Sequence, residues 1–313
     1  MANTYGKVSG TFEEIDNAYG KVSGVWKEAD EIYGKVSGVW KLVFAAFTPG
    51  SIQTLSSGSG TFTVPDGANA IHIQASAGGG GGAAGGASYD KAGGESAGAG
   101  GGSGAYVSDK VFTVTAGETI SYSIGGGGAP GNQTANFSQP RIASAGSSTT
   151  LSGSSAGSLF TLGAGGGSSG TGGGVQGPLR TNTAGTGGSA SISGTVVSSG
   201  TFRDSDGTTK NITSLTSGPV GTFNQSGNGV SGSNNGNCSG DNCRIGGSTG
   251  ATSYSGNVAG GAGGSSSGSG TAGSAGTRGS GGGGGAAQVT GGGATNGASG
   301  GNGEVRYRFL RVN

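Results

Sequence analysis

Long runs of glycine are the feature that most constrains how this chain can fold. They occupy residues 78–86, 93–104, 163–174, 259–270 and 281–303. Glycine loses more backbone entropy on folding than any other residue, so an ordered tract of this kind needs a compensating reason. Collagen is excluded, because only 6 prolines accompany the 80 glycines and no strict glycine triplet is kept.

Two structures suit such tracts. Without Cβ atoms, extended helices with three residues per turn can lie side by side and donate hydrogen bonds to their neighbours. A flexible glycine–serine linker is the alternative. We favour ordered packing, because segments with strand patterns run directly into the tracts and would need the tracts to be positioned.

Alternating apolar and polar residues predict strands at five places. These are residues 60–64, 70–75, 105–115, 119–124 and 304–310. Pro65-Asp66-Gly67 reads as a turn after the first of them. His72 is the only histidine in the chain and lies between Ile71 and Ile73. We expect it on the polar side of its strand, without a chemical role.

Residues 1–48 carry a tandem repeat. Tyr-Gly-Lys-Val-Ser-Gly begins at Tyr5, Tyr19 and Tyr33, which is a period of 14 residues. Apolar residues spaced by three and four would suit a coiled coil, but each repeat would then place glycines inside a helix, at about 1 kcal/mol each. A hairpin with a tight Ser-Gly turn is favoured, since glycine supplies the positive φ that such turns need.

Composition and charge exclude several classes of protein. The formal net charge of +1 lacks the electrostatic footprint of a nucleic-acid-binding protein. No apolar run is long enough for a transmembrane helix, so we expect no membrane insertion. Residues 1–7 do not resemble a secretory signal.

Catalytic and metal sites have little support in the sequence. Gly-x-Gly-x-x-Gly strings are expected by chance in this composition, and no serine-hydrolase motif has the required context. Asp204-Ser205-Asp206-Gly207 resembles the start of a calcium loop but lacks the remaining ligands. Cys238 and Cys243 could form a disulfide or stay as free thiols, and a zinc site would need more ligands. We therefore expect no enzyme, cofactor or metal.

The segments between the tracts differ from them chemically. They combine serine, asparagine and glycine with scattered aromatic and arginine residues, as binding loops do. Each aromatic could instead be a local core that holds its loop down. The candidate contact residues are Tyr89, Phe137, Arg141, Phe160, Arg180, Phe202, Arg203, Phe223 and Tyr254.

The residues just described carry a family resemblance. Lys-Val-Ser-Gly-Val-Trp-Lys at 21–27 and 35–41 resembles the short N-terminal repeats of tailed-bacteriophage structural proteins. Gly-Thr-Phe-Thr-Val-Pro-Asp-Gly at 60–67, with the strand and poly-glycine that follow, is similar to the glycine-rich domain of phage tail-fibre and tail-tip proteins. The strand pair at 112–128 and the closing strand continue this pattern, whereas residues 129–257 resemble the family only in kind.

The resemblance implies a mostly β fold with irregular structure, packed polyglycine II-type helices and little or no α-helix. It divides the chain into an attachment module (1–48), a first glycine-rich part (49–130), variable loops with polyglycine tracts (131–279), and a closing tract with the C-terminal strand (280–313). Attachment to other virion proteins would use Tyr19, Trp26, Tyr33 and Trp40.

The function expected from the resemblance is a receptor-binding adhesin on a phage tail fibre or tail tip, located on the virion. Its expected partners are other tail or virion proteins and a bacterial surface receptor, which would be a glycan or an outer-membrane protein. A homo-oligomer is expected, with a trimer favoured. The alternatives are a capsid-surface fibre without a specific receptor and a glycine-rich surface protein of a cell.

Overall fold

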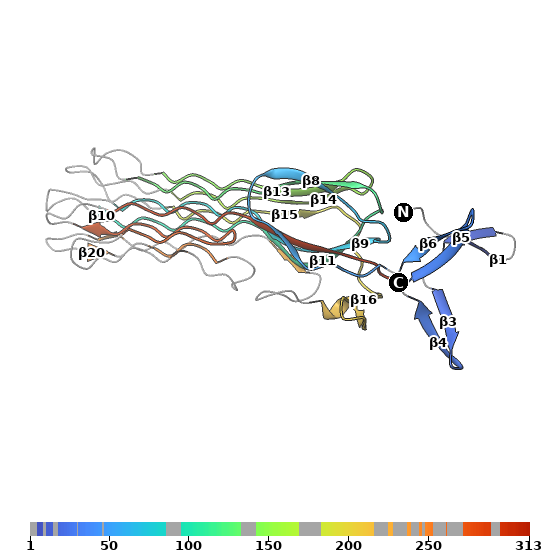
Figure 1. Ribbon diagram of the computed structural model, residues 1–313. Coiled ribbons are helices and arrows are strands. Elements are labelled where there is room, and N and C mark those ends of the chain that lie inside the picture. The colour runs from blue at the N-terminus through green and yellow to red at the C-terminus, as the bar shows by residue number, and fades with distance from the viewer. Residues whose placement is uncertain are drawn as a thin grey trace.

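The architecture comes from a computed structural model of the chain. Its described residues form a β-sandwich, a bundle of glycine-rich tracts that extends from the sandwich, and three small hairpins near the N-terminus (Figure 1). The structure describes the following residues: 5–8, 11–14, 18–29, 31–45, 47–85, 95–132, 142–168, 183–215, 225–227, 237–238, 244–245, 248–252, 261, 272–288 and 295–313.

The N-terminal repeats form β-hairpins, and the coiled-coil alternative is wrong. The paired strands are β1 (Tyr5–Val8) with β2 (Thr11–Glu14), β3 (Ala18–Val22) with β4 (Val25–Ala29), and β5 (Glu31–Val36) with β6 (Val39–Ala45). Ser23 and Gly24 have φ of 51° and 82°, and Ser37 and Gly38 have 53° and 84°. Positive φ at both central residues defines the type I′ turn, whose twist suits a two-residue hairpin.

Two five-stranded antiparallel sheets form the sandwich. The first sheet has the order β18-β11-β9-β22-β7 and the second β15-β14-β13-β12-β8. The strands of the first are β7 (Gln53–Leu55), β9 (Ala70–Ser76), β11 (Tyr106–Thr113), β18 (Gln225–Gly227) and β22 (Glu304–Leu310). Those of the second are β8 (Ser59–Thr63), β12 (Thr119–Ser123), β13 (Thr149–Gly153), β14 (Gly157–Leu162) and β15 (Ala190–Ile192).

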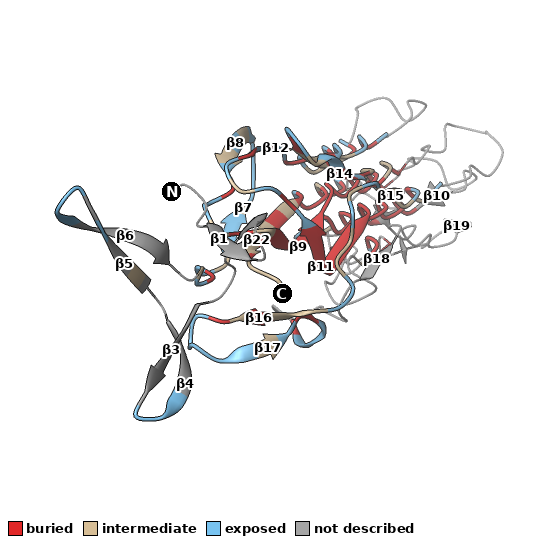
Figure 2. Cartoon of the chain, turned by 90° about the vertical axis from the view of Figure 1, so that its right-hand side faces the viewer, coloured by how far each residue is buried: buried red, intermediate tan, exposed pale blue. Residues whose placement is uncertain are grey.

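The apolar core lies between these two sheets. Ile71 and Ile73 of β9 and Phe112 of β11 face Leu151 of β13 and Phe160 of β14, all fully buried. A hairpin of β16 (Thr201–Arg203) and β17 (Thr209–Asn211), followed by the 3₁₀ turn η1 (Ile212–Ser214), forms a second small core against the first sheet. Figure 2 shows that β9, and β11 up to its last residue, are buried, because elements cover both faces of this sheet.

Most strands of the sandwich continue directly into a glycine-rich tract. The tract 77–85 follows β9, 97–105 precedes β11, 124–131 follows β12, 142–148 precedes β13, 163–168 follows β14, 183–189 precedes β15, and 295–303 precedes β22. The antiparallel sheets therefore make successive tracts run alternately away from the sandwich and back to it. At the far end lie short strands that pair β10 (Glu95–Ser96) with β19 (Asn237–Cys238) and β20 (Arg244–Ile245) with β21 (Ala287–Gln288) (Figure 1).

Hydrogen bonds between tracts repeat every third residue. Gly79, Gly82 and Gly85 donate N–H groups to the carbonyls of Gly301, Ala298 and Thr295, at 2.9, 2.8 and 3.0 Å. The tract 78–85 donates in the same way to 144–147 and 99–102, both antiparallel to it, and accepts from the parallel tracts 165–168, 128–131 and 282–285. This central tract thus bonds to six neighbours, and the period of three is that of the polyglycine II helix.

The absence of side chains permits this packing. A Cβ atom on Gly80 would lie 1.9 Å from the carbonyl oxygen of Gly166, and one on Gly79 would lie 2.0 Å from that of Ser280. In an outer tract, burial also repeats at every third residue. Gly125, Gly128 and Gly131 are buried, whereas Gly126 and Ala129 are exposed. Only one face of an outer tract needs glycine, so serine, threonine and alanine can occupy the other.

Gly80→Ala should therefore destabilise the protein by about 3 kcal/mol or prevent folding, because backbone atoms of a neighbouring tract would have to move. Gly126→Ala is the matched control, since no atom lies within 4 Å of its added Cβ, and it should stay within about 0.5 kcal/mol of the parent. Urea unfolding followed by circular dichroism measures both. Equal stability of the two variants would contradict the packed arrangement.

Candidate functional site

Two regions are candidates for function. The first is the distal end of the tract bundle, defined as the end that carries β10, β19, β20 and β21, away from the sandwich (Figure 1). The second is the outer face of the first sheet, where hairpin β16–β17 packs and where charged side chains gather. The described tracts that leave the sandwich run toward the distal end, and those that return run away from it.

Most of the predicted contact residues lie outside the part of the chain that the structure describes. Six of them lie outside the described residues: Tyr89, Phe137, Arg141, Arg180, Phe223 and Tyr254. Cys243 lies outside them too, and of Cys238 only the backbone pairing with Glu95 is described, so the disulfide remains a prediction. The side chains of Tyr19, Trp26, Tyr33 and Trp40 are likewise outside what the structure describes.

Phe160 and Phe202 are buried, which corrects their assignment as surface contacts. Phe160 is fully buried in the core, with its ring centroid 6.1 Å from that of Phe112. Phe202 is packed with Ile212, Leu215 and Leu310 in the second core. For both residues the local-core alternative holds. Arg203, next to Phe202 in β16, is half-buried.

The segments predicted as loops are also partly scaffold. Residues 142–148 and 183–189 are tracts of the bundle, and 149–153, 157–162 and 190–192 are strands of the second sheet. Sequence reasoning missed these elements because their serines, threonines and alanines hide the glycine pattern. The signal that could have found them is glycine at a spacing of three, as at Gly185 and Gly188, which are both buried.

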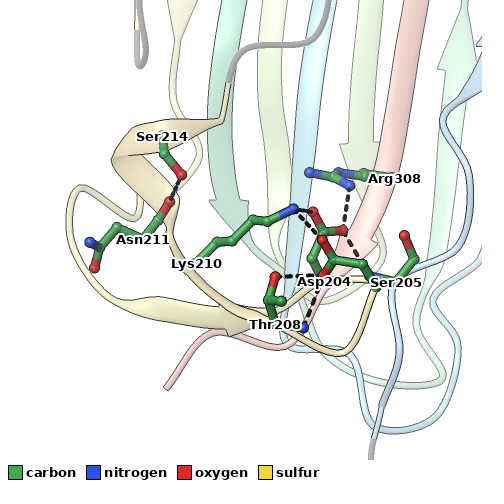
Figure 3. Close-up of polar contacts among 8 residues, drawn as sticks. Asp204, Ser205, Thr208, Lys210, Asn211, Ser214 and Arg308 are labelled. Atoms are coloured by element: carbon green, nitrogen blue, oxygen red, sulfur yellow. Dashed lines mark hydrogen bonds and ion pairs between the residues drawn. The ribbon is translucent and has the colours of Figure 1, made fainter.

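Ion pairs among charged side chains link hairpin β16–β17 to β22 (Figure 3). Lys210 donates to a carboxylate oxygen of Asp204 at 2.7 Å and of Asp206 at 3.0 Å, and Arg308 donates to the other oxygen of Asp204 at 3.1 Å. The guanidinium of Arg308 also lies 5.4 Å from the centre of the Phe202 ring. The hairpin is therefore fixed to the sheet by both its apolar and its charged side chains.

The two carboxylates of Asp204-Ser205-Asp206-Gly207, which resembled the start of a calcium loop, both contact Lys210. The ammonium of Lys210 lies between the two carboxylates, where a cation would have to bind. Burial raises the pKa of Asp204, but the hydrogen bond from Lys210 and further bonds outweigh it, so its pKa is lowered. Hydrogen bonds from Thr208 lower the pKa of Asp206. Among the described residues, no group of three or more histidine, cysteine or acidic side chains could hold a metal.

His72 was expected on the polar side of its strand, and its hydrogen-bond partner there is indeed polar, but this side is buried and not open to solvent. Its side chain is 1% exposed, and its Nε2 atom lies 2.9 Å from Oδ1 of Asp109, which is fully buried. Asp109 lies at an irregularity in β11 and has a φ of 46°. Gln74 donates to both oxygens of Asp109 at 3.2 Å. A histidine–carboxylate pair can serve acid–base chemistry, but here both side chains are shielded from solvent and act as a buried polar anchor.

Sequence reasoning had no means of finding this pair. His72 and Asp109 are 37 residues apart, on adjacent strands, and meet only because β9 and β11 pair with an irregular register. Burial lowers the pKa of His72, and the hydrogen bond with Asp109 opposes this change only in part.

Comparison with known proteins identifies the class of this chain. A family model described as a glycine-rich domain matches residues 54–310. The chain therefore belongs to the glycine-rich domain family, and the match spans both sheets and the whole tract bundle. A search of curated proteins finds no match. In the part of the chain that is described, no helix has the length and apolar character needed to cross a membrane.

Acidification should destabilise the protein through His72. Because its folded pKa lies below 6.5, the unfolded chain takes up a proton first as the pH falls. The free energy of unfolding therefore has its full value above about pH 6.5 and falls as the pH drops below it. The total loss is about 1.4 kcal/mol for each unit by which folding lowers the pKa of His72. Urea unfolding between pH 7.5 and pH 5 measures this. His72→Gln should show a smaller pH dependence, and an unchanged slope would contradict it.

Phe202→Ala should lower stability by about 3–5 kcal/mol, because it leaves a cavity in the second core. Thermal unfolding measures the loss, with Thr209→Ala as a control at an exposed position of the same hairpin. A Phe202→Ala variant of unchanged stability that had lost binding to cells would instead support the original surface-contact assignment.

Proposed function

We propose that this chain is a bacteriophage virion protein and a receptor-binding adhesin of a tail fibre or tail tip. Two lines of evidence support the proposal. The repeats and strand motifs resemble those of phage tail proteins, and the chain belongs to the glycine-rich domain family. The observation that carries it is the arrangement of the molecule: tracts extend from the sandwich to a distal end, with the hairpins and the C-terminus at the opposite end (Figure 1).

The bundle is suited to presenting segments at fixed positions. The described tract that leaves β9 ends at Gly85, and the next begins at Glu95 and returns to β11. The central tract bonds to six neighbours, so the points at which the chain leaves and re-enters the bundle are set by main-chain hydrogen bonds. A rigid scaffold with variable connections is a common arrangement for recognition.

The structure narrows the proposed contact surface. Since 142–162 and 183–192 are scaffold, we assign receptor contact to the segments that connect the distal ends of tracts. Three of these segments are 86–94, 133–141 and 169–182, and they contain Tyr89, Phe137, Arg141 and Arg180. Aromatic and arginine side chains are frequent energetic anchors of interfaces. Many copies on one particle would multiply a modest affinity.

The hairpins at the other end are proposed to attach the chain to the virion. They keep one cross-strand pairing in every repeat: Lys7 with Phe12, Lys21 with Trp26, and Lys35 with Trp40. A two-stranded hairpin is marginally stable by itself in water. A module of three such hairpins is thus expected to gain stability from a partner surface on the particle.

Tyr89→Ala and Arg180→Ala should each weaken binding of the purified protein to host cells by at least about tenfold, without a change in thermal unfolding. Thr209→Ala, at an exposed position near the sandwich, is the control and should bind as the parent does. Flow cytometry with fluorescently labelled protein measures binding. Normal binding by both variants would contradict the assignment of the contact surface.

Antibody–gold labelling of intact particles tests the location separately. Label at the tail tip or at fibre ends is expected. Label over the head would contradict the adhesin proposal and indicate a capsid-surface fibre, in which the same scaffold carries segments without a specific receptor.

A further inference from the structure

The edge strand β8 leaves one side of the second sheet open. It pairs only with β12, and the described part of the chain places no strand on its other side. Figure 1 shows β8 on the outside of the sandwich. Ser59, Thr61 and Thr63 are exposed, whereas Gly60 and Phe62 are half-buried. The edge is thus accessible along its whole length.

β8 lacks the features that usually protect an edge strand. Natural proteins block such edges with very short strands, lysine, proline or bulges, because unpaired main-chain groups recruit further strands. The other edge strands, β7, β15 and β18, each have three residues. β8 has five residues, with the sequence Ser-Gly-Thr-Phe-Thr, and contains no charge, no proline and no register shift against β12.

The hydrogen-bonding groups of β8 alternate in direction. Ile124 donates to the carbonyl of Gly58 at 2.8 Å, and Val64 donates to that of Glu118 at 2.9 Å. The bonded positions toward β12 are therefore the even-numbered residues of this strand. In an antiparallel ladder the residues between them direct both N–H and C=O to the opposite side. Ser59, Thr61 and Thr63 thus present their main-chain groups outward.

We propose that β8 pairs antiparallel with β8 of a second copy of this chain, in a two-fold contact centred on Thr61. Thr61 would then face Thr61 of the partner subunit, and Ser59 would face the partner's Thr63. Each chain directs three N–H and three C=O groups at the other, so every outward group finds a partner. The two second sheets become one continuous ten-stranded sheet, since each contributes five strands.

The side chains of β8 fit this register. On the exposed face, hydroxyl-bearing residues lie opposite one another, which is a favourable cross-strand pairing. On the core face, Phe62 lies opposite the partner's Gly60. Within its own sheet, Gly60 lies opposite Tyr122 of β12, whose hydroxyl oxygen would be 2.8 Å from an added Cβ. An aromatic ring across from an edge glycine shields its backbone and stabilises the pair.

Charge also favours a second copy over a charged partner. β8 has no ionisable side chain, so two copies meet without like-charge repulsion, and two-fold contacts are the commonest among homo-oligomers. This inference does not depend on the proposed function, because the contact lies on the sandwich and not at the distal end.

Sedimentation velocity of the full chain over about 1–100 µM tests the contact, because the dimer population must rise with concentration. The parent is expected to shift from 29.2 kDa toward twice that mass. Thr61→Pro removes an outward N–H that β12 does not use, and it should raise the dimer dissociation constant at least about tenfold. Thr61→Ala keeps the N–H and is the matched control; it loses only the side-chain pairing, so its dissociation constant should rise by no more than about fivefold.

A charge-swap experiment gives a second, independent readout. Thr61→Lys and Thr61→Glu each place like charges opposite one another, so each variant alone should stay monomeric. A mixture of the two should form a mixed dimer. A monomeric parent at all concentrations, a dimer that survives Thr61→Pro, no mixed dimer, or a mass of three chains would each overturn the inference.

Discussion

Lateral main-chain hydrogen bonds between glycine tracts are the interaction on which this structure depends. An extended three-residue helix has no internal hydrogen bonds, so all of its polar groups must find partners outside it. In the central tract 78–85, successive residues donate to three different neighbours in turn. The bundle therefore replaces a large apolar core with a lattice of backbone contacts, and this explains how a chain with 80 glycines in 313 residues can be ordered.

The β-sandwich supplies what the lattice lacks. Polyglycine tracts resemble one another, and nothing in their sequence fixes which tract lies beside which, or in what register. The strands that continue into them do have a register, set by apolar residues such as Ile71, Phe112 and Leu151 in the shared core. The pairing of β9 with β11 and β22 thus aligns the tract 77–85 with 97–105 and 295–303. Side-chain packing specifies the arrangement, and backbone bonding then extends it.

The parts of the fold that local rules control were predictable. A Ser-Gly dipeptide between two strand patterns predicted each hairpin turn. Ser23 and Ser37 have the positive φ that such a turn requires. The strands near 70–75, 119–124 and 304–310 followed from alternation. The tracts at 142–148 and 183–189 were not predicted, because only every third residue of an outer tract faces inward and needs to be glycine. Contacts between distant residues were also missed. Phe160, Phe202 and the His72–Asp109 pair are buried through tertiary packing, which a single sequence does not reveal.

The separation in sequence between neighbouring tracts has a consequence for how the chain folds. Gly79 bonds to Gly301, near the opposite end of the chain, while Gly80 bonds to Gly102 and Gly81 to Ser144. The central tract is synthesised early, but it gains its full set of partners only after almost the whole polypeptide has left the ribosome. Such distant contacts must be formed against a large loss of chain entropy, and they slow the transition from unfolded to native. We therefore expect assembly of the bundle to be a late and cooperative step, completed when the last strand, β22, enters its sheet between β9 and β7.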